Sequence, residues 1–192
     1  MAAVNRMAPA CRAHGSPARA ALLFCLVALV PSLISGQAPQ QASEYQVKAA
    51  FLLNFTKFVI WLDAAFADAN SPLAICILGD DPFDGVLDQL VEGEEVNGRK
   101  LLVRHIQQPP APKLCQELFI SSRQKDVPAI IAAAGPGVLT VGDRDGFLRE
   151  GGIIAFVIEN RHVRFDINQR AASSASLSLS ARLLSVARSV QK

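Results

Sequence analysis

Two segments with different hydrophobic patterns lie next to each other between residues 151 and 168. Ile153–Ile158 is an unbroken apolar run, which is typical of a strand covered on both faces. His162–Asn168 alternates instead, so that one face is apolar and the other carries His162, Arg164, Asp166 and Asn168. Three polar residues, 159–161, separate the two runs. The pattern predicts an antiparallel hairpin whose second strand has one open polar face.

Upstream of this hairpin, strand and helix patterns alternate from residue 73 onward. The predicted strands cover 73–78, 100–106, 116–120 and 137–141, and the predicted helices cover about 81–92, 121–133 and 143–150. Apolar side chains at helical spacing predict a long final helix over about 171–190. This alternation predicts an α/β fold: a three-layer-like sandwich with a mostly parallel sheet, an antiparallel C-terminal hairpin and flanking helices.

Residues 44–62 predict an unusually apolar first helix, opened by Ser43 and Glu44. Apolar side chains cover most of its circumference and leave only a thin polar stripe. Such a helix is either buried on nearly all sides or covers its spare apolar face with a partner. For the second reading, the candidate interface residues are Tyr45, Leu52, Phe55, Phe58 and Trp61.

The N-terminus has the order of a secretory signal peptide. Three arginines precede the apolar run Ala20–Val30, and small residues follow at Ser35 and Gly36. An uncleaved anchor is the alternative, but the run is well short of the roughly 20 residues that a spanning helix needs. We therefore expect a signal peptide over 1–36, a linker over 37–43, a single α/β domain over 44–192, and no membrane insertion after cleavage.

The charge of the mature chain argues against nucleic acid as a partner. The predicted signal peptide holds three of the 19 basic residues and none of the 17 acidic ones, so 16 basic residues remain. A nucleic-acid-binding protein normally carries a basic surplus gathered on one face.

Cleavage would also leave two of the four cysteines, Cys76 and Cys115, in an oxidising compartment. A disulfide between them is the simplest outcome there. A redox-active thiol pair is the rival reading, although neither cysteine lies in a CxxC motif.

Catalytic signatures are missing from the sequence. It contains no GxGxxG, Walker, GxSxG or HExxH motif, and the mature chain has only His105 and His162 as histidines. Four acids near residue 80 could suggest a cation site, but acids at a helix start are explained by the helix dipole. We therefore expect no enzyme activity, no catalytic residues, no cofactor and no metal.

The open face of the hairpin is the best candidate for binding a small ligand. Its residues are Arg161, His162, Arg164 and Asp166, which Arg104 or His105 would join if their strand lies nearby. Two arginines can bind a carboxylate or a phosphate through forked hydrogen bonds. A solvated strand face with internal Arg–Asp pairing is the alternative.

Six segments together resemble the YfiR-like family. They are EYQVKAAFLLNFTKFVIW, ICILGDDPF, NGRKLLVR, CQELFIS, VLTVGDRDGFLREGGIIAFV and VRFDINQRAASSASLSLSARLLSVAR, and they span nearly the whole mature chain. The better-known members are periplasmic regulators of an inner-membrane diguanylate cyclase. The resemblance implies a periplasmic α/β protein that binds the sensor domain of such a membrane-bound cyclase, or of a similar receptor, and holds it inactive. It also implies a homodimer, and it supplies no catalytic residues.

The resemblance also bears on the cysteines. Cys76 and Cys115 lie where the family has a disulfide, which supports that pairing. Some members carry a second cysteine pair in the region that corresponds to 143–160, and this chain has none there. Redox control through a second bond is therefore not expected. A periplasmic module that binds a small anion is the alternative function.

Overall fold

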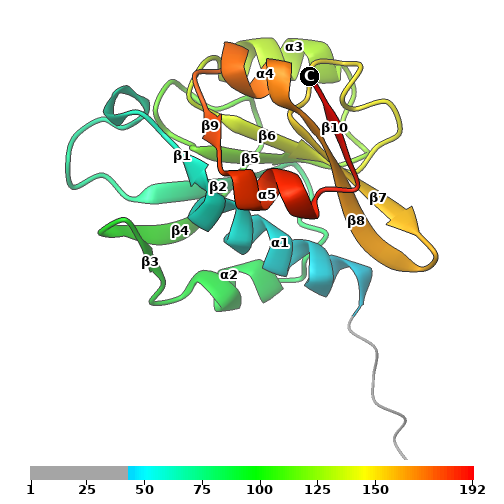
Figure 1. Ribbon diagram of the computed structural model, residues 1–192. Helices are drawn as coiled ribbons and strands as arrows, with labels where there is room; N and C mark the ends of the chain where they lie inside the picture. Colours follow the sequence, from blue (N-terminus) through cyan, green and yellow to red (C-terminus); the bar gives the residue numbers. More distant parts are fainter. Residues whose placement is uncertain (1–42) are drawn as a thin grey trace, which may run out of the picture. The chain divides into compact units, whose positions relative to one another are not determined.

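The computed structural model describes residues 43–192. The predicted signal peptide and nearly all of the predicted linker lie outside these residues. Within the described part, no helix is long and apolar enough to cross a membrane. The described residues form a central sheet with helices on both faces (Figure 1).

The main sheet has eight strands in the order β10-β8-β7-β6-β5-β2-β4-β3. Their bounds are β2 (Leu73–Leu78), β3 (Glu95–Val96), β4 (Arg99–Ile106), β5 (Glu117–Ile120), β6 (Leu139–Gly142), β7 (Ile154–Glu159), β8 (His162–Asn168) and β10 (Ser189–Gln191). Neighbours from β4 to β7 pair in parallel, as do β8 and β10, whereas β3–β4 and β7–β8 are antiparallel. The predicted fold class, with its antiparallel hairpin, is confirmed.

Helices cover both faces of this sheet. They are α1 (Glu44–Phe58), α2 (Val86–Val91), α3 (Val127–Ala134), α4 (Gln169–Ser174) and α5 (Ala181–Val186), with a 3-10 turn η1 (Asp63–Ala65). The core beneath α1, α2 and α5 is separate from the core beneath α3, where the disulfide lies. Figure 1 shows α3 on the opposite side of the sheet from α1 and α2.

The first helix is shorter than predicted. Ser43 caps it with a capping box, but it ends at Phe58 and not near residue 62. Val59 and Ile60 are β-branched, and as β1 (Val59–Ile60) they pair with β9 (Ser178–Leu179) in a small second sheet. Pairing with a distant segment therefore overrides the helical pattern.

The prediction of one long C-terminal helix over 171–190 is wrong. The segment folds as α4, β9, α5 and β10. Ser176 adopts a left-handed φ of 59°, and the Ser180 hydroxyl caps α5 by accepting a hydrogen bond from the Leu183 N–H. Serine competes with the helix backbone for hydrogen bonds, so a serine-rich segment with helical spacing is easily divided.

Three predicted helices of the middle region also differ from the observed structure. The helix expected from about 81 begins only at Val86, because the Asp81 carboxylate accepts hydrogen bonds from the N–H groups of Phe83 and Gly85. The helix expected from 121 begins at Val127. Residues 143–150 form turns and no helix. Loops therefore follow β2, β5 and β6 directly, and those after β2 and β5 line the cleft described below.

Candidate functional sites

The hairpin residues predicted to bind a ligand do not form one site. Asp166 is paired with Arg188, whose Nε lies 2.8 Å from Asp166 Oδ1, and Arg188 also lies 3.8 Å from Glu159. Asp166 is therefore already ion-paired with Arg188, the residue directly before β10 (Ser189–Gln191). Four strands separate β8 from β4, so Arg104 and His105 do not join the hairpin face.

Arg161 and His162 line a groove between the hairpin and the start of α1. This α1–hairpin groove has a volume of about 610 Å³, and Arg164 and Asp166 are not among its lining residues. Its lining consists of Glu44, Val47, Phe51, Ile158, Arg161, His162 and Val163. The structure therefore divides the four candidate residues into two pairs.

The five candidate interface residues of α1 and its C-terminal extension also separate. Leu52 and Phe55 are 0% and 1% exposed, because they face the sheet. Tyr45 packs edge-on against Phe83, and the indole N–H of Trp61 donates to the Gln116 carbonyl at 3.1 Å. Both side chains are half-buried in the chain's own contacts.

Phe58 lines a second groove, between α1 and α5. This α1–α5 groove has a volume of about 300 Å³ and is lined by Phe51, Asn54, Phe55, Phe58, Phe165, Arg182, Leu183 and Val186. The Arg182 guanidinium lies 5.5 Å from the centre of the Phe58 ring, in a cation–π contact at the rim.

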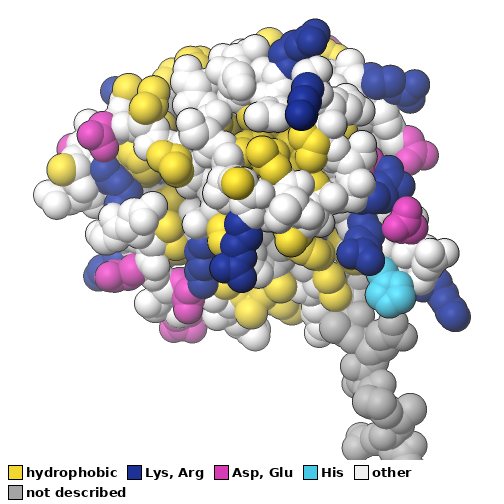
Figure 2. Space-filling model, in the orientation of Figure 1, with side chains coloured by type: hydrophobic (Ala, Val, Ile, Leu, Met, Phe, Trp, Pro, Cys, Tyr) yellow, Lys and Arg dark blue, Asp and Glu magenta, His cyan; other side chains and the backbone are white. Residues whose placement is uncertain are grey.

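Because Phe51 lines both grooves, they form one continuous surface along α1, which we call the α1 face. Ile158 and Val186 are 52% and 58% exposed at its two ends. Figure 2 shows hydrophobic side chains gathered over α1 and α5 with Lys and Arg beside them. The α1 face is therefore apolar with basic side chains at its edge.

A buried ion pair joins α1 to the end of β6. Lys48 Nζ lies 2.9 Å from Asp143 Oδ2 and 2.6 Å from Glu44 Oε1, and the side chains of Lys48 and Asp143 are 4% and 3% exposed. Burial lowers the pKa of Lys48, but the hydrogen bonds to Glu44 and Asp143 outweigh burial and leave the pKa raised. Lys48 therefore stays charged.

The same carboxylate binds two further groups. The Tyr45 hydroxyl donates to Asp143 Oδ2 at 3.1 Å, and the Ser122 N–H donates to Oδ1 at 2.8 Å. Burial of its hydroxyl, together with the Asp143 charge, raises the pKa of Tyr45. Asp143 thus ties α1, β6 and the loop after β5 together, which sequence reasoning missed because Lys48 lies inside an apolar helix.

The strand order places a cleft at the carboxyl ends of β2 and β5. From β2 the chain goes to β4 on one side of it, and the next parallel strand, β5, lies on the other side. In open α/β sheets, ligands bind where the order reverses in this way. Leu78 and Ile120 are paired at the ends of the two strands, so the loops that follow leave the sheet next to each other.

A cavity of about 310 Å³ lies at this position, and we call it the switch-point cleft. Its lining residues are Tyr45, Asp80, Asp81, Pro82, Asp84, Ser121, Ser122 and Arg123. Ser121 is 4% exposed, and its hydroxyl has no hydrogen-bond partner among the described residues. The sequence signal is a pair of polar residues soon after each apolar strand, Asp80 and Asp81 after β2 and Ser121 and Ser122 after β5, but no local pattern shows that the two pairs meet.

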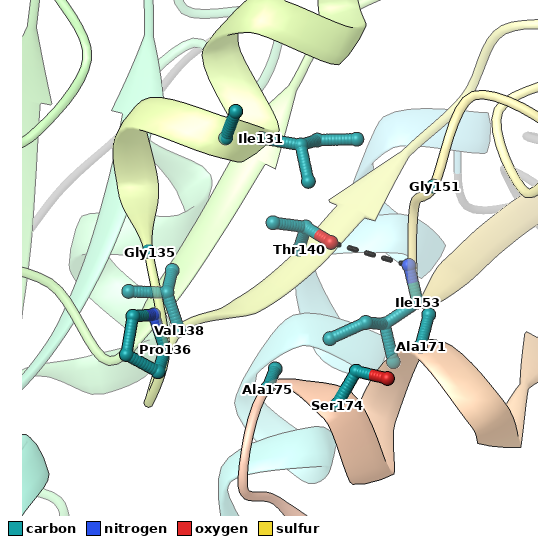
Figure 3. Close-up of a pocket in the computed structure, with 11 residues that line it drawn as sticks. Ile131, Gly135, Pro136, Val138, Thr140, Gly151, Ile153, Ala171, Ser174 and Ala175 are labelled. Atoms are coloured by element: carbon teal, nitrogen blue, oxygen red, sulfur yellow. Dashed lines mark hydrogen bonds between the residues drawn. The ribbon is translucent and has the colours of Figure 1, made fainter.

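Another cavity, of about 540 Å³, lies between α3 and α4 (Figure 3). The Thr140 hydroxyl accepts a hydrogen bond from the Ile153 N–H at 3.2 Å in its wall. The remaining lining is apolar or small: Ile131, Ala132, Gly135, Pro136, Val138, Gly151, Ala171, Ser174 and Ala175. No titratable side chain belongs to this lining, so the cavity contains no group that could act as an acid or a base.

Asp81, Asp88 and His105 bring one possible metal-ligand atom each to within 4.8 Å of one another. Asp88 Oδ1 lies 3.3 Å from His105 Nε2, and the Asp81 oxygens accept two backbone hydrogen bonds. These contacts pair Asp88 Oδ1 and both oxygens of Asp81, whereas the buried Asp88 Oδ2 has no hydrogen-bond partner among the described residues.

Cys76 and Cys115 form a disulfide, with their Cα atoms 5.8 Å apart. Cys76 lies in β2, Cys115 lies just before β5, and the two residues are 0% and 1% exposed. Such burial is typical of a structural crosslink and not of a reactive thiol pair.

Comparisons with known proteins agree with this fold. No curated protein matches the chain. Among solved structures, it is similar to the crystal structure of a conserved domain protein from Vibrio cholerae O1 biovar El Tor strain N16961, with a TM-score of 0.50 and 11% identity over 79% of this chain and 61% of that chain. The chain thus spans less than two thirds of that protein, and the likeness concerns the fold alone. The model of the YfiR/HmsC-like family matches residues 45–188, so the chain belongs to this family.

Proposed function

We propose that the protein is a periplasmic, non-enzymatic regulator. It binds the periplasmic sensor domain of an inner-membrane diguanylate cyclase, or of a similar receptor, and holds that partner inactive. Membership of the YfiR/HmsC-like family supports the class of function. The α1 face is the observation that carries the proposal on this chain.

The α1 face has the properties of a protein-binding surface. Ile158 and Val186 expose large apolar side chains at 52% and 58%, next to the half-buried Phe51 and Phe58. Contiguous exposed apolar surface with a polar rim is typical of an interaction site. Because Arg182 lies at its edge, the complementary surface of the partner is apolar with acidic groups around it.

The α1 face also supports a homodimer, in which a second copy would cover part of it. A second copy would bind in the purified protein, whereas the receptor contact needs membranes. Light scattering of the purified protein measures its mass in solution and therefore distinguishes a homodimer from a monomer that waits for the receptor.

The alternative function, an anion-binding module, is less well supported by the geometry. Only Arg161 and His162 of the four predicted residues line the α1–hairpin groove, and the carboxylate-bearing Glu44 lines it with them. Asp166 neutralises Arg188 nearby. The local charge therefore does not favour an anion.

A pull-down from detergent-solubilised membranes tests the proposed function. Val186→Asp and Ile158→Asp place charges on the α1 face at exposed positions, so the fold tolerates them, and each is expected to reduce recovery of the cyclase by at least about tenfold. Leu90→Asp, at the 37% exposed Leu90 of α2, is the matched control and is expected to retain the partner.

The cellular readout is the cyclic di-GMP level. Deletion of the gene is expected to raise it, and only the wild-type protein and the Leu90→Asp variant are expected to restore it. An unchanged level in the deletion strain, together with the recovery of no membrane protein, would refute the proposal.

A further inference from the structure

We propose that the outer edge of β7 binds an extended segment of a partner protein that carries lysine or arginine side chains. The segment lies beside β7 as an additional strand. This outer edge is distinct from the α1 face, although Ile158 lines a cavity on each. Binding there is a second interaction, beyond the contact of the α1 face with the receptor.

The first part of β7 is covered by β6, and the rest is not. The pairing of β6 with β7 ends at Gly142 and Ala155, whereas β7 stays paired with β8 up to Glu159 and His162. Among residues 43–192, the last four residues of β7 therefore have a neighbouring strand on one side only. Figure 1 shows the tip of this hairpin projecting beyond the neighbouring strands.

The backbone of Ile158 faces this open side. A two-residue turn with left-handed φ of 49° and 64° closes the hairpin, so Glu159 and His162 form a hydrogen-bonded pair. Such pairs alternate with pairs whose N–H and C=O groups point away from the partner strand, and Ile158 belongs to the next pair. The Phe165 C=O follows the same alternation on β8, because it accepts a hydrogen bond from the Arg188 N–H outside the hairpin. Ile158 therefore presents one backbone donor and one acceptor to an added strand.

A cavity of about 430 Å³ lies along this open edge, and we call it the edge cavity. Its lining residues are Glu44, Lys48, Asp143, Asp145, Phe156, Val157, Ile158 and Arg188. Successive strand residues point to opposite faces of a sheet, so a cavity lined by three consecutive residues of β7 surrounds the edge of that strand. Asp143 follows the last residue of β6, and the cavity therefore lies where β6 would continue beside β7.

The charges around the edge cavity set the chemistry of the added strand. Lys48 and Arg188, the two cations of its lining, are both bound to carboxylates of the chain itself. Asp145 is exposed and forms no salt bridge with another described residue. It is therefore available to a lysine or arginine of the added strand. A second copy would bring another Asp145 to the same edge, and this repulsion favours a different, basic partner.

Titration of the isotope-labelled protein with a six-residue peptide of alternating Thr and Lys, acetylated and amidated at its ends, tests the proposal. Amide NMR spectra are expected to show saturable shifts of the Ile158 and Asp145 signals, with a Kd of about 1 mM or tighter. The peptide with Glu in place of Lys is expected to bind at least about tenfold more weakly, because its charges oppose Asp145. A peptide that is N-methylated at every residue has no backbone donor and is expected not to bind.

Amide hydrogen exchange measures the new hydrogen bond at a single residue. At saturating peptide, exchange of the Ile158 amide is expected to slow by at least about fivefold, which corresponds to one net hydrogen bond. The Val157 amide points towards β8 and is the internal control, which is expected to keep its rate.

Two substitutions at one position locate the added strand. Ile158→Pro removes the outward N–H and no hydrogen bond to β8, and proline is accepted on an open edge at such a position. It is expected to weaken peptide binding by at least about fivefold, whereas Ile158→Val keeps the N–H and is expected to bind as wild type does. Urea denaturation checks that the proline variant is folded. If it is not, Asp145→Asn decides, and it is expected to weaken binding by about threefold.

The proposal would be overturned by no saturable shift up to about 10 mM peptide. Equal binding of the Glu peptide, or equal affinity of wild type, Ile158→Pro and Asp145→Asn, would also overturn it. A dimer that Ile158→Pro dissociates in light scattering would show that a second copy occupies the edge, and would overturn it as well.

Val186→Asp separates this proposal from the proposed function. Val186 lines the α1–α5 groove and not the edge cavity, so this variant is expected to lose the membrane partner and to keep the peptide. Because the peptide titrations involve no membrane protein, their failure leaves the proposed regulator role intact.

Discussion

Lys48 and Asp143 show how one buried pair connects distant parts of this chain. Lys48 belongs to α1 and Asp143 follows β6, and their contact at 2.9 Å is almost fully buried. A buried charge is stable only with a hydrogen-bonded partner. The pair therefore fixes how α1 lies against the carboxyl ends of the strands.

Asp143→Ala is expected to lower the free energy of unfolding by about 3–5 kcal/mol, because Lys48 would remain buried with only the half-exposed Glu44 as a partner. Urea denaturation at neutral pH measures the change. Asp145→Ala, two residues further on and exposed, is the control and is expected to change stability by less than about 0.5 kcal/mol. Equal effects of the two substitutions would contradict a special role of the pair.

Glu117 is a second ionisable residue that the fold buries. It is fully buried in β5, and neither carboxylate oxygen has a hydrogen-bond partner among the described residues. Burial raises the pKa of Glu117 well above its usual value of 4.5. The folded protein therefore keeps this carboxyl protonated at pH values where the unfolded chain has lost the proton.

This difference predicts a pH dependence of stability. Above about pH 4.5 the folded state binds more protons than the unfolded state, so the Glu117 contribution to stability falls as pH rises towards the raised pKa. Glu117→Leu is expected to remove this slope and to raise the free energy of unfolding at pH 7 by about 1–3 kcal/mol. Urea denaturation from pH 4 to pH 8 measures both effects, and an identical slope in wild type and variant would disprove the assignment.

At the scale of elements, the disulfide connects the two strands that flank the switch-point cleft. It joins Cys76 in β2 to Cys115, two positions before β5, and the two cysteines are 39 positions apart in sequence. The two strands are also neighbours in the sheet, so the crosslink lies within the core beneath α3. In the chain-entropy model, such a bond stabilises the protein mainly by lowering the conformational entropy of the unfolded chain.

Replacing both cysteines, as Cys76→Ala with Cys115→Ala, is expected to lower the free energy of unfolding by roughly 4 kcal/mol, the chain-entropy estimate for a loop of this length. Chemical denaturation with and without a reducing agent measures the change. The variant is expected to ignore the reducing agent, whereas wild type is expected to approach the variant. A wild type that is equally stable in both conditions would show that the bond contributes nothing.

The final segment shows the limit of periodicity at this scale. Leu179, Leu183 and Val186 recur at helical spacing, yet Leu179 lies in β9 and the other two lie in α5. Both arrangements bury Leu183, so the apolar pattern alone cannot distinguish them. Backbone pairing of β9 with β1 and of β10 with β8 decides the outcome.

For the whole molecule, the two candidate surfaces lie at different places and have opposite character. The α1 face is apolar with arginines at its edge, and the switch-point cleft is polar and acidic. Tyr45 lines the cleft, and Glu44 beside it lines the α1–hairpin groove. The first turn of α1 therefore lies between the two.

The sequence by itself determined the alternation of strands and helices, the antiparallel hairpin at 153–168 and the α/β class, because hydrophobic periodicity and turn residues are local signals. The expected oxidising compartment and the family resemblance also predicted a disulfide between Cys76 and Cys115. Only the tertiary structure decided the strand order, and with it the cleft at Ser121. It also decided that Leu52 and Phe55 are core, that Lys48 meets Asp143, and that the last segment divides. These outcomes depend on contacts between residues far apart in the chain, which no local pattern encodes.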